Sequence, residues 1–161
     1  MGRLQNRDEG PLKNAAQLKT LLRDLFSSQS LAVLATYGSG QTYGSLVAFA
    51  ATDNLKSLLF ATTRATRKFD NLTHHPRIAL VMDNRSNRQT DFHRAIAVTA
   101  TGTVREVGTS ERDRLLSLYL SKHPYLREFA TSPTCALLRL DVDTYIVVSQ
   151  FQNVMELHIK K

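Results

Sequence analysis

Residues 58–82 read LLFATTRATRKFDNLTHHPRIALVM, and this stretch is the most informative part of the chain for its fold. Its apolar start, which runs into two threonines, is typical of a strand over residues 57–62. A short helix is expected over residues 66–74, because Thr66 is a favourable N-cap and Pro76 disfavours helical backbone just before it. The stretch therefore predicts a helix that begins directly after a strand ends.

The start of this helix carries positive charge in an unfavourable place. Arg67 and Lys68 lie in its first turn, where the helix dipole disfavours cations. A bound anion would remove the conflict, because the amide groups at a helix start bind phosphate and both cations would pair with it. The hydroxyls of Thr62, Thr63 and Thr66 would complete such a site. The alternative is that both cations simply extend into solvent, but the cluster of hydroxyls favours a phosphate site.

The charge around this segment indicates an anionic partner. Residues 64–94 contain seven basic residues against three acidic ones, in a chain with a net charge of +7. Such a surplus suits a nucleic acid, a membrane surface or a phosphorylated cofactor. A nucleic-acid-binding domain is disfavoured, because the chain has no Trp, only 7% aromatic residues and no recognised nucleic-acid motif.

The rest of the sequence predicts a mainly β protein with inserted helices. Apolar residues at helical spacing indicate helices over residues 13–28 and 110–122. Short connections between the first strands favour an antiparallel arrangement, and Gly102 is expected at a bend or bulge. Residues 83–94 and 124–133 are expected to be connections. The predicted strands cover residues 31–37, 43–52, 57–62, 78–82, 95–107, 134–140, 144–150 and 154–159.

Several simple features limit the class of protein. No apolar run approaches the roughly 20 residues of a membrane-spanning helix, and the start of the chain lacks the apolar region of a signal peptide. Cys135 is the only cysteine, which excludes an internal disulfide and predicts a buried thiol. Residues 1–161 show no linker or repeat and are expected to form one domain, with a flexible tail over residues 1–11. We therefore expect a cytoplasmic protein that binds no membrane.

Two segments of the chain resemble a known family. The stretch 58–82 resembles the phosphate-binding segment of the pyridoxamine 5'-phosphate oxidase-like FMN split barrels, in which Ser/Thr-Arg-Lys opens a helix after a strand that ends in Thr. VTATGTVREV, residues 98–107, resembles the strand that follows in that family. The likeness extends from about residue 20 to 150. It implies a six- to eight-stranded antiparallel split β-barrel, homodimeric, with FMN bound at the subunit interface.

The resemblance also implies which residues hold the cofactor. The threonines and cations at the helix start would bind the phosphate and ribityl chain of FMN. Residues 45–48 would lie along the isoalloxazine ring through backbone groups, although core packing explains these strand residues equally well. Residues 84–87 would approach the ring edge or the phosphate, in their own subunit or in the partner's. The implied residues are Ser45, Leu46, Val47, Ala48, Thr62, Thr63, Thr66, Arg67, Lys68, Asn84, Arg85, Ser86 and Asn87.

Three departures from the family pattern argue against oxidation of vitamin B6. Ala61 stands where true oxidases tend to carry Tyr, Ala97 stands where they tend to carry Gln, and residues 145–161 lack their terminal Arg-Leu…Arg segment. The sequence therefore predicts an FMN-dependent oxidoreductase whose small-molecule redox substrate is unassigned. Three alternatives stay open: a flavin-binding sensor without turnover, a split barrel that binds deazaflavin or heme, and a basic nucleic-acid-binding domain.

Overall fold

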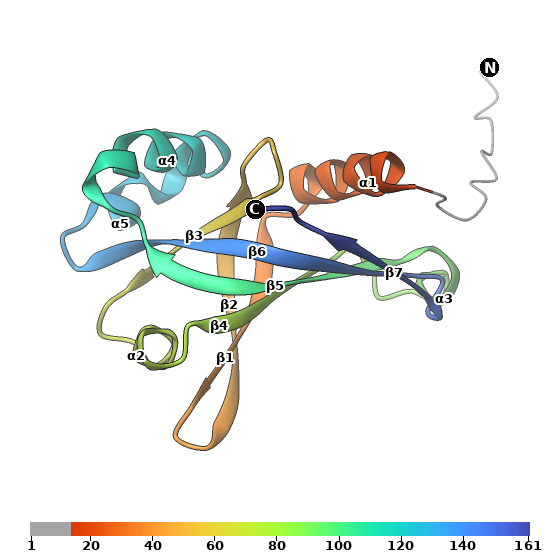
Figure 1. Cartoon of the computed structure of the whole chain (residues 1–161), viewed down its shortest axis with the longest axis horizontal. Helices are drawn as coiled ribbons and strands as arrows, with labels where there is room; N and C mark the ends of the chain where they lie inside the picture. The colour runs from red at the N-terminus through yellow and green to blue at the C-terminus, as the bar shows by residue number, and fades with distance from the viewer. Residues whose placement is uncertain (1–13) are drawn as a thin grey trace.

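The architecture is an antiparallel barrel with helices packed around it (Figure 1). The computed structural model describes residues 14–161, so the tail predicted over residues 1–11 lies outside the described residues. The strands are β1 Leu31–Gly38, β2 Gln41–Ala51, β3 Ser57–Thr63, β4 Arg77–Asp83, β5 Ile96–Glu106, β6 Cys135–Ser149 and β7 Asn153–His158. Six strands follow the order β3-β2-β1-β4-β5-β6, β6 pairs back with β3, and β7 extends the sheet beside β6. The predicted mainly β fold and antiparallel barrel are confirmed, whereas the homodimer stays a prediction.

β6 is the strand that closes the barrel. One of its edges pairs with β5 along most of its length. Its other edge pairs with β3 over Cys135–Asp141 and with β7 over Thr144–Ser149. One long strand therefore takes part in both the closed barrel and the additional β6–β7 hairpin. The two strands predicted over residues 134–140 and 144–150 are parts of this single strand.

The break predicted between those two strands was wrong for an electrostatic reason. A strand of 15 residues runs straight through residues 141–143. Asp141 pairs with Arg139 at 2.8 Å, and Asp143 pairs with Arg77. The valine between the two acids is buried in the barrel. Because both carboxylates are neutralised on the outside, the strand continues across these residues, and the alternation of inward and outward residues shifts by one place at Asp143 and Thr144.

The expected irregularity at Gly102 is confirmed. Thr101 faces Thr144 on β6, but Gly102 faces Val142, so one residue of β6 is left without a partner at this β-bulge. A Cβ atom at Gly102 would lie 2.0 Å from the backbone oxygen of Asp141. Only glycine allows the two strands to approach so closely at this point.

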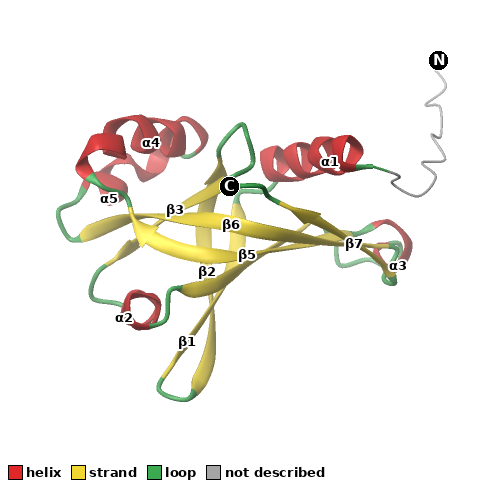
Figure 2. Ribbon diagram, viewed as in Figure 1, coloured by secondary structure: helices red, strands yellow, loops and turns green. Residues whose placement is uncertain are grey.

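Three helices were expected, and all three are present (Figure 2). Asn14 caps the first one by accepting a hydrogen bond from the Gln17 amide at 2.9 Å. Two expected connections also contain short helices, so their prediction as irregular segments was wrong in part. The helical segments are α1 Ala15–Ser28, α2 Arg67–His74, α3 Asp91–Arg94, α4 Thr109–Lys122, the 3-10 turn η1 Pro124–Leu126 and α5 Arg127–Thr131.

The short helices were missed because they depend on single contacts rather than on a periodic pattern. The carboxylate of Asp91 accepts hydrogen bonds from the backbone amides of Ser86 and Arg88, which folds the loop back onto the start of α3. Ala130 of α5 is fully buried against the barrel. Segments of four or five residues are too short to show helical periodicity.

The core consists of two apolar clusters separated by the barrel wall. The larger cluster fills the barrel and includes Phe49, Phe60 and Tyr145, with Phe26 of α1 covering one end. The smaller cluster lies between the outer face of the barrel and α4 and α5. It contains Cys135, which is buried as predicted, and burial raises the pKa of its thiol. β3 is buried on both faces, which explains its continuous apolar sequence.

α4 is anchored to β2 by two buried polar contacts. The Tyr119 hydroxyl donates to the Ala48 carbonyl at 3.3 Å, and Nε2 of His123 lies 2.7 Å from the Phe49 carbonyl oxygen. A carbonyl oxygen only accepts, so Nε2 carries the proton of a neutral imidazole. Burial lowers the pKa of His123 below its ordinary value.

The close approach at the bulge predicts the effect of Gly102→Ala. We expect the free energy of unfolding to fall by about 2 kcal/mol or more, because the backbone of β6 would have to move away. A urea titration would measure the loss. Gly44→Ala is a matched control in β2, since its Cβ would meet only Val33 at 3.9 Å, and it should change stability by less than about 1 kcal/mol. Equal stability of the two variants would contradict the close contact.

The buried imidazole predicts a pH dependence of stability. His123 binds its proton less readily in the folded state than in the unfolded state, whose histidine pKa is about 6.5. The contribution of His123 to the free energy of unfolding is therefore complete above the unfolded-state pKa of about 6.5, and it is lost as the pH falls below that value. We expect the free energy of unfolding to decline from pH 7 to pH 5, and His123→Gln should reduce the decline. His93→Gln, at an exposed position of α3, should leave the slope unchanged. A variant without His123 that shows the full slope would be evidence against this assignment.

Candidate functional site

The candidate site begins where β3 ends and α2 starts. Thr66 is the N-cap of α2, and its Oγ1 accepts from the Phe69 amide at 3.3 Å. The same hydroxyl donates to the Thr63 carbonyl at 2.8 Å and lies 3.3 Å from the Thr62 hydroxyl. Thr62 is buried at the end of β3. The structure therefore brings the three predicted threonines together at the start of α2.

The cations of this region fall into two groups. Arg64 forms a two-pronged ion pair with Glu106, with 2.9 Å between Nη1 and Oε2, and Arg77 and Arg85 are also paired with carboxylates. None of the ion pairs formed within residues 14–161 includes Arg67 or Lys68. Arg67 and Lys68 in the first turn of α2 therefore carry uncompensated charge, as do Arg88 and Arg94 farther along the chain.

The position of Arg67 is fixed by an aromatic residue of the neighbouring hairpin. Its guanidinium carbon lies 5.2 Å from the centre of the Tyr43 ring, which belongs to β2. This is within the range of a cation–π interaction. The contact holds the cation beside the β1–β2 hairpin, which projects from the barrel on the same side as α2 (Figure 1).

α2 itself is held against β1 by one buried amide. Asn71 is 5% exposed, and its Nδ2 donates to the Thr36 hydroxyl at 3.1 Å. A Cβ at Gly38 would lie 2.0 Å from Oδ1 of Asn71, so the amide packs directly on the glycine backbone. These contacts fix the orientation of the helix and thereby the place of its first turn.

The four predicted residues of β2 do not share one face. Val47 is buried in the barrel, whereas Leu46 on the opposite face is 65% exposed. The carbonyl of Ala48 accepts from Tyr119. The Oγ atom of Ser45 is buried and has no hydrogen-bond partner within the described residues. A buried hydroxyl without a partner is unfavourable, which marks this position as one where a ligand would supply the missing contact.

The edge of β2 beside these residues is open. β2 and β3 pair only over Phe49–Ala51 and Leu58–Phe60. The rest of β3 continues in its ladder with β6, so the two strands diverge beyond this point. Residues 45–48 consequently have no strand ladder on the β3 side.

The predicted loop residues 84–87 lie elsewhere in the chain. Oδ1 of Asn84 accepts from the Ile96 amide at 2.7 Å, Arg85 pairs with Asp83 at 3.2 Å, and the amide and hydroxyl of Ser86 donate to Asp91. Asn87 has a positive φ of 60°, and all four residues are exposed. β4 separates this loop from α2, and α2 and α3 lie at opposite ends of the sheet (Figure 1). One chain therefore does not bring residues 84–87 to the threonine cluster.

The hydrogen bonds of this loop lower the pKa of Asp91. Amide and hydroxyl donors from Ser86, together with the Arg88 amide, keep the pKa of Asp91 below its ordinary value. Its carboxylate is therefore charged across the neutral range and holds the loop in shape.

No group of three or more His, Cys, Asp or Glu side chains within residues 14–161 could hold a metal ion. None of the helices in that range is long and apolar enough to cross a bilayer.

The family model for pyridoxamine 5'-phosphate oxidase matches residues 18–149, most of the chain. The chain belongs to the pyridoxamine 5'-phosphate oxidase-like family. No curated protein matches the chain in sequence.

Solved structures show how widely this family fold is shared. A heme binding protein from Mycobacterium smegmatis aligns with 91% of the chain and 59% of its own length, at 16% identity and a TM-score of 0.79. A Clostridium acetobutylicum protein related to general stress protein 26 aligns over 91% of the chain and 97% of its own length, at 16% identity and a TM-score of 0.70. An FAD-binding protein from Mesorhizobium loti aligns over 80% of the chain and 90% of its own length, at 12% identity and a TM-score of 0.64. The chain thus spans about three-fifths of the Mycobacterium protein. At these identities the likeness establishes the fold alone.

Two positions at which this family member departs from the oxidase pattern are in the barrel wall. Ala61 is 6% exposed and belongs to the apolar cluster beneath α4. Ala97 lies on β5, opposite Val148 and Asp83 of the neighbouring strands. Neither methyl group can donate or accept a hydrogen bond, so these positions would contact a ligand only through packing or through the backbone.

Two residues that position the site were missed at the sequence level. Tyr43 and Asn71 are separated from their partners in sequence and make contact only after folding. A weak signal for Asn71 was present, because it is a polar residue beside Leu72 on the buried side of a short helix. Nothing in the sequence marked Tyr43 as a partner of Arg67.

Proposed function

We propose that this chain binds FMN at the start of α2 and acts as an FMN-dependent oxidoreductase. The observation that carries the proposal is the pair of uncompensated cations, Arg67 and Lys68, in the first turn of a helix. A phosphate dianion there would neutralise both charges and accept hydrogen bonds from the free amides of the helix start. The clustered hydroxyls of Thr62, Thr63 and Thr66 would bind the phosphate and the ribityl chain.

The open edge of β2 fits the ring of the same cofactor. The buried Oγ of Ser45 lacks a partner within residues 14–161, and a polar atom of the isoalloxazine would supply one. Leu46, Val47 and Ala48 would line the ring through backbone groups, because no strand ladder occupies the β3 side of this segment. The residues present therefore fit a flavin better than a purely structural role.

Because FMN itself carries out the electron transfer, the protein has to supply the binding, the orientation and the electrostatic environment of the cofactor. FMN, when bound, supplies electron transfer by one or two electrons. The chain's own residues bind the phosphate, orient the ring and place positive charge near it. None of the residues proposed to contact the cofactor is a carboxylic acid or a histidine, so substrate and electron donor are unassigned. The same observation supports a flavin-binding sensor as the rival function.

A second copy of the chain would complete this arrangement. Leu46, Val33, Val81, Thr99 and Ile146 form one row across five neighbouring strands and point away from the barrel core. The row carries no charge, and Leu46 is 65% exposed in the single chain. An uncharged row of this kind suits the centre of a homodimer interface.

The dimer would also explain the distant loop. Residues 84–87 cannot reach the start of α2 in their own chain, so they would approach the flavin of the partner subunit. We take each subunit to be one domain, and a cytoplasmic location fits its single, unpaired Cys135.

Heme is the second candidate ligand. A structural neighbour from Mycobacterium smegmatis is a heme binding protein, and Arg67 and Lys68 would pair with propionates as readily as with a phosphate. The absorption spectrum separates the two cofactors, because flavin gives near-ultraviolet and blue bands whereas heme gives a Soret band.

The double variant Arg67→Ala, Lys68→Ala tests the phosphate site. Loss of two charge-assisted contacts of about 1.5 kcal/mol each should weaken FMN binding by about 100-fold. Fluorescence quenching during titration with FMN would measure the affinity. Lys56→Ala with Arg114→Ala removes the same charge from other exposed positions and should leave the affinity within about threefold of the original. Unchanged affinity in the first variant, or uptake of heme in preference to FMN, would refute the proposal.

Val81→Glu tests the interface. A carboxylate in the middle of the uncharged row would be buried without a partner, so the variant should sediment as a monomer where the original protein sediments as a dimer. Thr20→Glu, on the exposed side of α1, is the control and should remain dimeric. Circular dichroism would check that both variants are folded. A folded, dimeric Val81→Glu variant would exclude this face as the interface.

A further inference from the structure

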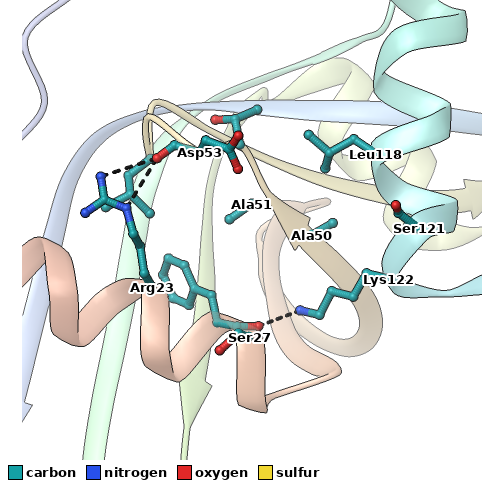
Figure 3. A pocket seen from close by; sticks show the side chains of 11 residues that line it. Arg23, Ser27, Ala50, Ala51, Asp53, Leu118, Ser121 and Lys122 are labelled. Atoms are coloured by element: carbon teal, nitrogen blue, oxygen red, sulfur yellow. Dashed lines mark hydrogen bonds between the residues drawn. The ribbon is translucent and has the colours of Figure 1, made fainter.

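A second pocket lies on the other side of the molecule, between α1, the turn that joins β2 to β3, and the end of α4 (Figure 3). Its volume is about 620 Å³, which is within the range of small-molecule sites. None of its lining residues belongs to the proposed flavin site. The pocket therefore requires an explanation of its own.

The floor of this pocket is apolar. Ala50 and Ala51 of β2 form its centre, and Leu118 of α4 and Phe26 of α1 form its sides. Small side chains in the middle leave the space that a ligand would fill. Contact with these surfaces favours a compact hydrocarbon group rather than a sugar or a polar chain.

Lys122 brings an unpaired positive charge to the edge of this floor. The side chain extends from α4 toward α1, where its Nζ donates to the Phe26 carbonyl at 2.7 Å and lies 3.9 Å from the centre of the Phe49 ring (Figure 3). An ammonium has three N–H groups, and only one is used by that carbonyl. Within residues 14–161 no carboxylate forms an ion pair with Lys122. Burial lowers the pKa of Lys122 to about 8.

Arg23 supplies a second cation from the opposite wall. Its Nε and Nη2 both donate to the backbone oxygen of Asp53 at 3.4 Å, which are long hydrogen bonds. The guanidinium keeps further N–H groups for another acceptor. Asp53 is the only acidic residue that lines the pocket, so two cations and one acid leave a net charge of +1. A single negative charge on the ligand would balance the pocket.

We propose that this pocket binds a small monocarboxylate with a compact apolar body. Its carboxylate is held by Lys122, Arg23 on the opposite wall adds to the positive charge of the pocket, and its body rests on Ala50, Ala51 and Leu118. A simpler explanation for Lys122 is that it caps the carbonyl end of α1, where a cation is favourable. Capping uses one N–H group of Lys122 and accounts neither for the pocket nor for the second cation on its opposite wall. The carboxylate accounts for all three features.

Benzoate is a suitable probe, with benzamide as its uncharged isostere. Isothermal titration calorimetry should show saturable binding of benzoate that is at least tenfold tighter than that of benzamide. Amide resonances of Ser27, Ala51 and Leu118 should shift during an NMR titration, because these residues line the pocket. Equal affinity for both probes, or no binding of benzoate at millimolar concentration, would overturn the proposal.

Two variants separate the charge of the pocket from its shape. Lys122→Met keeps an apolar stem and should weaken benzoate binding at least tenfold. Ser27→Trp fills the pocket from an exposed position of α1 and should abolish binding without touching Lys122, even if Lys122→Met loosens the helix. Thr20→Trp, on α1 but outside the pocket, is the matched control and should bind as the original protein does. Unchanged binding by Ser27→Trp would place benzoate elsewhere.

The two proposed sites are tested independently. The variant Arg67→Ala, Lys68→Ala should keep its affinity for benzoate, and Ser27→Trp should keep its affinity for FMN. Competition between benzoate and FMN would instead show that benzoate occupies the start of α2 and would overturn this second site.

Discussion

The pairing of β3 with the first half of β6 is the constraint on which the rest of this structure depends. It closes the barrel, and it carries the end of β3 away from β2. That divergence opens the edge of β2 at Ser45 and places Thr62 and Thr63 beside the start of α2. The close approach at Gly102 belongs to the same arrangement, because it lets β6 bend between its partners β3 and β7. The candidate site is thus a consequence of how the barrel closes.

Part of the chain's charge is paired on the outside of the barrel. Glu111 of α4 alone pairs with Arg105, Arg114 and Arg139, and this network ties the helix to β5 and β6. Exposed pairs of this kind contribute little to stability individually. Cations without an ion pair are informative where they lie next to space for a ligand. The start of α2 and the pocket beside Lys122 are two places where the structure holds positive charge next to space for a ligand.

The outer face of the sheet completes this division of the surface. The row from Leu46 to Ile146 is uncharged, although the chain as a whole carries a net charge of +7. The row is an uncharged patch on five strands, whereas charged residues such as Arg77, Asp141 and Glu156 occupy other positions of the strands. A surface divided in this way suits a subunit that joins a second copy and keeps its ligand sites at the margins.

The sequence by itself determined the features that depend on neighbours along the chain. The N-cap at Thr66, the cations that follow it, the glycine at the bulge and the short antiparallel strands are all encoded within a few residues. Local signals could not show that one strand continues through Asp141 and Asp143, because Arg105 and Arg77, both far away in sequence, help to neutralise these acids. Only the tertiary structure decided which cations stay unpaired, which hydroxyl at Ser45 is left without a partner, and where the pocket at Lys122 forms. Each of these depends on contacts between residues far apart in sequence, and such contacts exist only once the barrel has closed.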